Sequence, residues 1–473
     1  MSDEAPLTPA QAAFVKRRRL IPAIIGIGLL LQHLDGTILA NALPAIGRDF
    51  GESPLMLNHA IAIYLLSAAV FLPISGWVSD RFGARRIFMV AIVAFATTSL
   101  LCGFAQNSAQ LIGGRFLQGM AGALMMPVGR TVLLKSAPKK DLVDALATVT
   151  MPALLGPIIG PPIGGFIVEF ASWRWIFWVN APIAVLGFFL IWRFIPVIEP
   201  ETTGPPDIKG FLYSAACLAG IVFGVQNARD FPWPVTAALI VAGFVAGALF
   251  VRHARRVSQP ILDLSVMRVP TYFISNVGGA MIRSASAAIP FLTALQLQLG
   301  FGLNAFSAGA IACVGAAGAL LMKTAAPPLL RRFGFRRVLL GNAAFTAISI
   351  ASIGLLQPST PVVLMLLAIF AAGFFRSLQF TALNALAYGD LAPEQISRAS
   401  ALQSVGQQII QSLGVTIAAA IVSGLSLATG APALSATVIA PAFVVFAGFT
   451  LISVPFFLRL APDAGGEMAG RRR

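Results

Sequence analysis

RFGARR, at residues 81–86, returns 251 positions later as RFGFRR, at residues 332–337. Each copy lies between two long apolar segments. Internal repeats of this kind are typical of transporters that are built from two related halves, with a substrate site at the boundary between the halves. The repeat therefore predicts a duplicated membrane protein.

The composition indicates an all-α membrane protein that crosses the bilayer many times. Hydrophobic residues make up 57% of the 473 residues and charged residues only 11%, which does not suit a water-soluble core. Fourteen segments are apolar and long enough to span a bilayer. We expect them at 20–44, 57–79, 87–105, 109–134, 143–168, 172–192, 210–227, 233–251, 270–298, 304–328, 336–356, 361–388, 398–424 and 437–458.

The Lys and Arg residues are spread unevenly over the connecting segments. With a cytoplasmic N-terminus, 25 of the 33 fall on the cytoplasmic side, five fall within spans, and three (Arg48, Arg174 and Arg229) fall on the opposite side. This asymmetry follows the positive-inside rule and predicts that both termini are cytoplasmic. Inner loops that face anionic lipid account for the net charge of +15. Basic patches with interleaved aromatic residues are missing, so we expect no nucleic acid partner.

The repeat also predicts the order of the helices. The first copy follows the second expected span and the second copy follows the tenth, so two helices are inserted between two halves of six. The expected organisation is a cytoplasmic tail at 1–19, a six-helix bundle at 20–198, a linker with two inserted helices at 199–269, a second six-helix bundle at 270–458 and a basic tail at 459–473.

Four further strings carry a resemblance to a known family. They are GWVSDRFGARR at 76–86, LIGGRFLQG at 111–119, GPIIGPPIGG at 156–165 and LDGTILANALP at 34–44. In their order along the chain they resemble the major facilitator superfamily, and within it the fourteen-helix drug/proton antiporters (DHA2, EmrB/QacA type). PVGR at 127–130 and EFASWRWIF at 169–177 resemble the MdtD-like branch of that group. The resemblance implies two six-helix bundles plus two inserted helices in the inner membrane, and export driven by the proton gradient without a bound cofactor. One departure is Ala40, where that family usually has asparagine; here Asn41 follows it.

The loop motif is a candidate conformational latch. Gly83 permits a tight turn, and Asp80 can pair with an arginine or cap a helix. A basic loop that only sets topology would explain the arginines but not the glycine and aspartate. The second copy has Arg331 in place of Asp80, so the latch is expected to be asymmetric. The residues of the candidate latch are Gly76, Asp80, Arg81, Gly83, Arg85 and Arg86.

The string at 156–165 resembles the antiporter motif of the family. Its glycines recur every four residues, which gives one smooth helix face for close packing, and its prolines remove backbone donors and bend the helix. Glycine and proline are also common in spanning helices generally. The candidate motif residues are Gly156, Pro157, Gly160, Pro161, Gly164 and Gly165.

Asp35 is the single acidic residue deep in an expected span, and a carboxylate at that depth indicates a function. At ~1.5 Å per residue, Asp35 lies about 22 Å from the inner end of its span and Arg115 about 9 Å from the outer end of its own, so the two depths coincide. A carboxylate that alternates between an arginine and a proton can carry protons. A static ion pair that only holds two helices together is the alternative.

Other polar residues within spans are candidates for a substrate cavity. His33 lies two positions from Asp35 and so faces a different side of its helix, where a hydrogen-bonded packing role is the alternative. Isolated cations usually face a cavity or an acidic partner. The glutamines lie at intervals of four on one helix face, which also suits hydrogen bonds between helices. The cavity candidates are His33, Arg283, Arg376, Gln403, Gln407 and Gln411.

Three classes of function compete. The leading prediction is a proton-coupled exporter that works by alternating access, with Asp35 as the proton carrier and with small-molecule substrates, protons and the lipid bilayer as its partners. The family favours drugs, whereas Arg283 and Arg376 favour organic anions or metabolites. A membrane-embedded enzyme or a sensor is the second alternative, although no metal site, catalytic cluster or phosphate loop is visible. The expected oligomeric state is a monomer.

Overall fold

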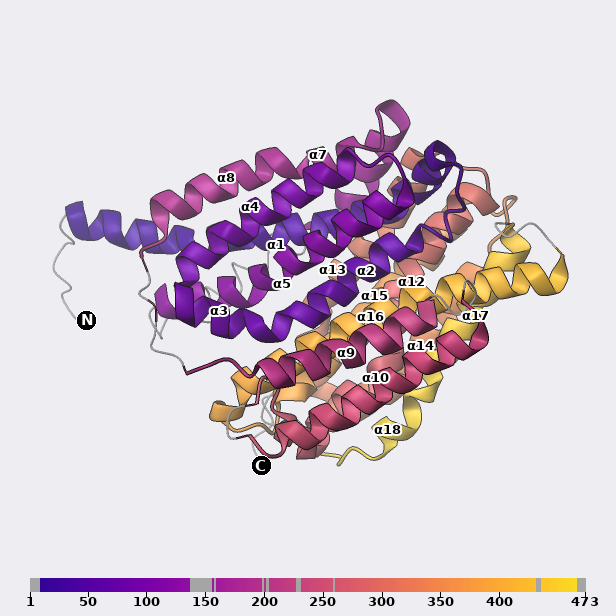
Figure 1. The fold of residues 1–473 in the computed structure, drawn as a ribbon. Helices are drawn as coiled ribbons and strands as arrows, with labels where there is room; N and C mark the ends of the chain where they lie inside the picture. The colour runs from indigo at the N-terminus through magenta and orange to yellow at the C-terminus, as the bar shows by residue number, and fades with distance from the viewer. Residues whose placement is uncertain are drawn as a thin grey trace.

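Long helices lie side by side in the computed structural model of the chain (Figure 1). The structure describes residues 9–136, 155–156, 159–197, 200, 204–226, 231–257, 260–430 and 435–465. Within these ranges, 12 helical segments are long and apolar enough to cross a membrane. They coincide with twelve of the fourteen predicted spans, so the polytopic helical class is confirmed.

The first half of the chain contains one long helix followed by shorter ones. A single turn of 3-10 helix at Leu72–Ile74 joins α2 to α3 without a break in the chain direction. The segments are α1 (Pro9–Phe50), α2 (Asn58–Phe71), α3 (Ser75–Phe82), α4 (Ala84–Gly103), α5 (Ser108–Ser136), the helix Ile159–Phe170, α7 (Trp175–Trp178) and α8 (Asn180–Phe194).

The second half repeats this pattern after a pair of additional helices. Two segments of π-helix, Ile274–Gly278 and Gln296–Gly300, flank α12 and join it to its neighbours. The segments are α9 (Ile208–Gln226), α10 (Trp233–Ala254), the 3-10 helix Leu264–Arg268, α11 (Pro270–Phe273), α12 (Ala280–Leu295), α13 (Ala305–Phe333), α14 (Phe335–Gly354), α15 (Val362–Tyr388), α16 (Pro393–Thr429), α17 (Ala436–Ile452) and α18 (Val454–Leu458).

Two predicted spans are not among the twelve candidates. The span predicted at 109–134 is the 29-residue α5, which carries the polar residues Arg115 and Gln118 in an otherwise apolar sequence. The span predicted at 143–168 falls largely outside the described residues, and its described part is the helix Ile159–Phe170. The first predicted span, 20–44, begins where the apolar helical segment begins, at Leu20, but it ends too early, because that segment continues to Phe50.

The repeated motif has the same backbone geometry in both copies. Gly83 separates α3 from α4 with φ +87°, and Gly334 separates α13 from α14 with φ +79°. Residues with a Cβ rarely adopt such angles, so glycine is required at both turns. The predicted tight turn at Gly83 is therefore confirmed.

The arginines that follow the two turns also occupy equivalent positions. The Arg85 guanidinium donates through Nη2 to the carbonyl oxygen of Trp192 at 2.5 Å, near the end of α8. The Arg336 guanidinium donates to the carbonyl oxygen of Leu458 at 3.1 Å, at the end of α18. In each half the loop is thus fastened to the last helix of that half, which supports the predicted duplication.

The two helices that the sequence predicts as an insertion, α9 and α10, form a hairpin at the periphery of the molecule. They pack against each other, and α9 also contacts α2 and α16, one from each half (Figure 1). Most of their side chains face outward, as their low burial in the described structure indicates. This position suits a pair of helices added to a preformed bundle.

Buried apolar side chains form one core that both halves share, together with separate cores within each half. The shared core joins residues of α1, α12, α16 and α17, including Leu43, Leu292 and Phe443. Separate cores fill the other end, one around Phe88 and one around Leu383. The two halves share this large core at one end, and a smaller cluster around Ala123 and Val405 also joins α2 and α5 of the first half to α16 and to the hairpin of α9 and α10.

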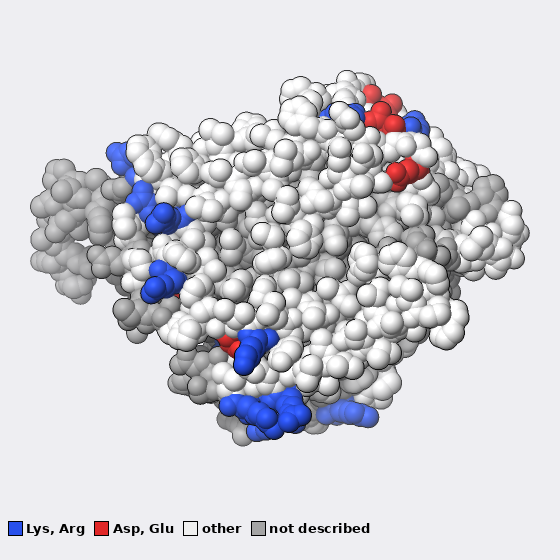
Figure 2. All heavy atoms as spheres, in the orientation of Figure 1, with Lys and Arg blue, Asp and Glu red and all other residues white. Residues whose placement is uncertain are grey.

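The charged side chains differ between these two ends. On the face that Figure 2 shows, Lys and Arg gather at the end where α3 and the beginning of α9 lie, and most of the acidic side chains lie at the opposite end, near α7. The shared core lies at the acidic end, since it includes Ile176 and Phe177 of α7. This distribution agrees with the sequence-based charge asymmetry.

Asp207 fastens the inserted hairpin to the segments on either side of it. Its Oδ1 accepts hydrogen bonds from His253 Nε2 at 2.7 Å and from the Gly210 N–H at 2.9 Å, and its Oδ2 accepts one from the Ile261 N–H at 3.2 Å. Partial burial alone would raise the pKa of the Asp207 carboxyl, but these hydrogen bonds outweigh it and hold the pKa below the ordinary value.

We expect Asp207→Asn to lower the stability of the protein by about 1 kcal/mol at neutral pH, because hydrogen bonds to a charged carboxylate are lost. A group with a depressed folded pKa stabilises above its unfolded pKa, near ~4, and loses that contribution as the pH falls through the folded value. The difference between variant and wild type should thus disappear in acid. Thermal unfolding in detergent at several pH values measures it, with the exposed Glu169→Gln as control. An equal difference at all pH values would contradict the role of the charge.

Candidate proton and substrate site

Asp35 and Arg115 form a buried ion pair between α1 and α5. Asp35 is 3% exposed and Arg115 is 1% exposed, and Arg115 Nη1 lies 2.5 Å from Asp35 Oδ2. The predicted coincidence of their depths is therefore confirmed. The Arg115 guanidinium also donates through Nε to the Ala60 carbonyl oxygen at 3.2 Å, and it lies over the Tyr64 ring, 4.3 Å from the centroid.

Two neutral amides complete the shell of the carboxylate. Gln118 Nε2 donates to Asp35 Oδ1 at 2.9 Å, and Asn180 Nδ2 donates to the same oxygen at 3.0 Å. Asn180 also donates to Ser99 Oγ at 2.9 Å, so α8 and α4 are drawn into the network. Both carboxylate oxygens thus have partners, and one positive charge balances one negative charge in a buried site.

Gln118 and Asn180 were not among the residues predicted for this site. Gln118 follows Arg115 by three positions in the string LIGGRFLQG, so the two side chains share a helix face, and this spacing could have revealed it. Asn180 begins α8 after a short turn, and nothing in its sequence neighbourhood indicates that it reaches α1. Only the packing of α8 against α1 and α4 brings it to Asp35.

A cavity of about 440 Å³ lies beside this network, between the two halves of the chain. Pockets for drug-sized ligands have volumes of roughly 300–1,000 Å³. Its walls come from α1, α2, α5 and the helix Ile159–Phe170 on one side and from α12, α13, α15 and α16 on the other. Arg115 lines the cavity, whereas its partner Asp35 does not.

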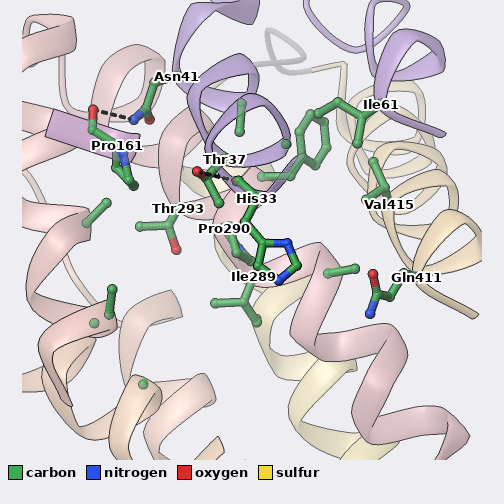
Figure 3. Close-up of a pocket in the computed structure, with 18 of the residues that line it drawn as sticks. His33, Thr37, Asn41, Ile61, Pro161, Ile289, Pro290, Thr293, Gln411 and Val415 are labelled. Carbon is green, nitrogen blue, oxygen red and sulfur yellow. Dashed lines mark hydrogen bonds between the residues drawn. The ribbon is translucent and has the colours of Figure 1, made fainter. Parts of the chain in front are cut away.

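His33 reaches into the cavity from α1, and the Gln411 amide reaches into the same space from α16 (Figure 3). His33 therefore faces away from Asp35, as the two-residue spacing predicted. Gln411 is joined on this wall by Gln408, three positions earlier, which the prediction did not include. Ile289 and Val415 supply apolar surface nearby.

The glycines of the antiporter-like string pack directly against α1. A Cβ at Gly156 would lie 2.9 Å from His33 Cβ, one at Gly164 would lie 3.1 Å from Ile38 Cγ2, and one at Gly160 would overlap Thr37 Oγ1. The predicted smooth packing face is thus confirmed. Pro157 lies outside the described residues.

The same helix meets the second half of the chain. A Cβ at Gly165 would overlap the carbonyl oxygen of Ala305 at the start of α13, and a Cβ at Gly309 of α13 would overlap the carbonyl oxygen of Pro161. Two backbones therefore touch across the boundary between the halves. Asn41 adds a second link, because its Nδ2 donates to the Pro161 carbonyl oxygen at 3.0 Å (Figure 3). The backbone carbonyl oxygen of Asn41 accepts from Gln298 Nε2 at 3.0 Å.

The two cations of the second half have different surroundings. Arg376 of α15 lines the cavity. Arg283 of α12 is 1% exposed and does not line it; its Nη2 donates to Asn384 Oδ1 at 2.9 Å. Gln403 and Gln407 donate to the same Asn384 oxygen at 2.9 and 3.2 Å, so these glutamines follow the alternative of hydrogen bonds between helices.

The candidate latch residues lie together at the junction of α3 and α4. Arg81 and Arg86 are exposed, Asp80 and Arg85 are half-buried, and Gly83 is buried in the turn. Gly76 lies one turn earlier, near the start of α3, with open space around its Cα. All six lie at one end of the first half, between Asp35 and Arg115 in the sequence.

Comparison with known proteins identifies similar chains. The model of the "Major Facilitator Superfamily" matches residues 25–289. A multidrug resistance protein MdtD of Pectobacterium carotovorum subsp. carotovorum (strain PC1) is 36% identical over 397 residues, which cover 84% of this chain and 85% of that protein. The MdtD protein of Salmonella heidelberg (strain SL476) is 35% identical over 402 residues, which cover 84% of each.

Solved structures share the fold at low sequence identity. A bacterial homologue of the human lysosomal transporter Spinster aligns with a TM-score of 0.67 and 16% identity over 97% of this chain and 98% of that one. The nucleoside transporter NupG aligns with a TM-score of 0.63 and 13% identity over 94% of this chain and all of that one, 100%.

Proposed function

The chain belongs to the major facilitator superfamily, and we propose that it is a proton-coupled exporter of drugs or other amphiphilic small molecules. Its relatives are transporters rather than enzymes, which removes the membrane-enzyme alternative. The names of the MdtD relatives support drug efflux. The proton coupling rests on the site itself.

The observation that carries the proposal is the position of Asp35. Its helix α1 lines the cavity on one side, and its ion-pair partner Arg115 lines the cavity directly. Burial makes an ionised carboxylate costly unless a cation balances it. Asp35 therefore has two states that avoid an unpaired negative charge, one paired with Arg115 and one protonated.

Proton binding in this site would change the shape of the cavity wall. While Asp35 is ionised, it holds Arg115 against α1. A proton on Asp35 removes the electrostatic attraction, and Arg115 keeps only its bonds to Gln118 Oε1 and the Ala60 carbonyl oxygen. A guanidinium released from its carboxylate can move toward the cavity, so protonation and substrate binding are coupled through one side chain.

Alternating access would use the difference between the two ends of the molecule. The large shared core closes the end near α7, while each half also has a core of its own at the other end and the two share a smaller cluster around Ala123 and Val405. Rocking of one half against the other about the cavity would exchange which end is closed. We propose fourteen spans in all, with α5 and the segment that includes Ile159–Phe170 as the fourth and fifth, both termini in the cytoplasm, and a monomer in the inner membrane.

The proposal is tested with purified protein in proteoliposomes that contain a pH-sensitive dye. Addition of a transported drug should release protons from vesicles with an acidic lumen, and an imposed pH gradient should drive accumulation of the drug. Vesicles without protein provide the background. Transport that neither moves protons nor responds to the gradient would contradict proton coupling while leaving a transporter in place.

A further inference from the structure

Arg376 is a half-buried cation whose charge no described residue balances. It lines the cavity from α15, and its Nη1 is buried without a hydrogen-bond partner. Among the described residues Arg376 forms no ion pair. The deep carboxylate Asp35 is already paired with Arg115. None of the residues that line the cavity is Asp or Glu.

An unpaired guanidinium in such a place is energetically unfavourable. A cation within a membrane protein normally pairs with an acid or with backbone carbonyls, or it faces a cavity that brings its partner. Arg283 illustrates the usual solution, since its guanidinium binds the Ser275 carbonyl oxygen and Asn384 Oδ1. Arg376 has neither kind of partner among the described residues, yet it borders the space where a ligand would lie.

The rest of the cavity suits an apolar body with one anionic end. Ile289, Phe291 and Ile369 provide apolar walls, while His33, Gln408 and Gln411 provide polar groups at other points of the lining. Guanidinium groups bind carboxylate and sulfonate oxygens through paired N–H donors. The apolar body of such a ligand would contact the apolar walls, and its anionic group would contact the Arg376 guanidinium.

Resting on the proposed transport function, we propose that the cavity binds amphiphilic organic anions, with the carboxylate or sulfonate group of the ligand held by Arg376. This proposal excludes lipophilic cations as the preferred substrates. A cation in this cavity would meet Arg376 with no carboxylate in the lining to offset it.

The same arrangement links anion binding to Asp35. Protonation of Asp35 leaves Arg115 without its counter-charge at the cavity wall, so an anion and a proton should favour each other within a single conformation. Exchange of an anion for a proton across the membrane then does not arise from competition for one group. It requires that the inward-open and outward-open conformations differ in their affinities for the anion and for the proton.

Binding of three isosteric probes to the protein in lipid nanodiscs tests the site. At neutral pH, naphthoate should bind at least about tenfold more tightly than naphthamide or naphthylmethylammonium, a difference that isothermal titration calorimetry resolves. Arg376→Gln should abolish the preference for naphthoate, and Arg376→Lys, which restores a cation, should recover part of it. Asp35→Asn should tighten naphthoate binding several-fold.

Arg283→Gln is the matched control, because it removes a buried cation from the same half without touching the cavity lining. It should keep the preference for naphthoate, and thermal unfolding verifies that each variant is folded. Tightest binding of the ammonium probe, a preference that survives Arg376→Gln, or no binding of any probe at millimolar concentration would overturn the proposal. The measurement needs no proton gradient, so anion binding by a protein that moves no protons would refute the transport mechanism and retain the site.

Discussion

Replacing Asp35 with Asn should reduce proton-driven transport to the rate of protein-free vesicles, a loss of more than about tenfold. Asn retains the size of the side chain and an oxygen that can accept from Gln118 and Asn180, but it cannot take up a proton. Arg115 would then face an uncharged partner in every state of the transport cycle. The proposed switch between an ion pair and a protonated acid would be lost.

A static ion pair would also make this variant inactive, through loss of structure. Removal of one partner of a buried pair leaves the other charge uncompensated and costs about 3–5 kcal/mol. The double variant Asp35→Asn with Arg115→Gln removes both charges and should recover much of that stability. It should remain unable to couple transport to protons. Asp35→Glu keeps a titratable group and should retain part of the coupling.

The decisive comparison is between stability and coupling in these three variants. Thermal unfolding in detergent reports the first, and dye-detected proton movement in proteoliposomes reports the second. If the double variant regains proton-driven transport together with its stability, the pair is structural and Asp35 carries no proton. If only stability returns, the carboxylate itself is the coupling group.

The general architecture could be predicted from the sequence because it depends on local patterns. Hydrophobic runs separated by basic loops located twelve spans that the structure contains, and the two copies of RFGxRR marked equivalent turns. Gly83 and Gly334 require the same left-handed backbone in both halves, so a short motif carried information about a distant repeat. The ends of the helices were harder to predict from the sequence, since α1 continues through Pro44 to Phe50.

The candidate site could be predicted only in part, and the reason is geometric. Asp35 and Arg115 were paired because helix rise converts sequence position into depth in the bilayer, and matching depth is a necessary condition for contact. Depth does not specify which way a side chain faces across a bundle. Arg283 and Arg376 therefore looked alike in the sequence, although one is bound to Asn384 and the other lines the cavity.

Gly165→Val should reduce the transport rate by more than about tenfold, although Gly165 is not part of the ion pair. A Cβ at Gly165 would overlap the Ala305 carbonyl oxygen, and a backbone atom cannot turn aside as a side chain can. Over-packing of this kind costs roughly 1–3 kcal/mol, and each ~1.4 kcal/mol changes a conformational equilibrium about tenfold. The state in which the helix Ile159–Phe170 rests on α13 should become poorly populated.

Gly309→Val approaches the same contact from the other half, since its Cβ would overlap the Pro161 carbonyl oxygen, and it should have the same effect. Gly113→Val in α5 is the matched control, because no atom lies within 4 Å of the added Cβ. Spin labels on the two halves, placed near Gly165 and Gly309, should show longer distances in both contact variants by electron resonance, with unchanged distances in the control. Because neither glycine touches the ion pair, proton uptake by Asp35 should persist while the exchange between conformations slows. Normal transport by Gly165→Val would show that the two backbones never need to approach this closely during the cycle.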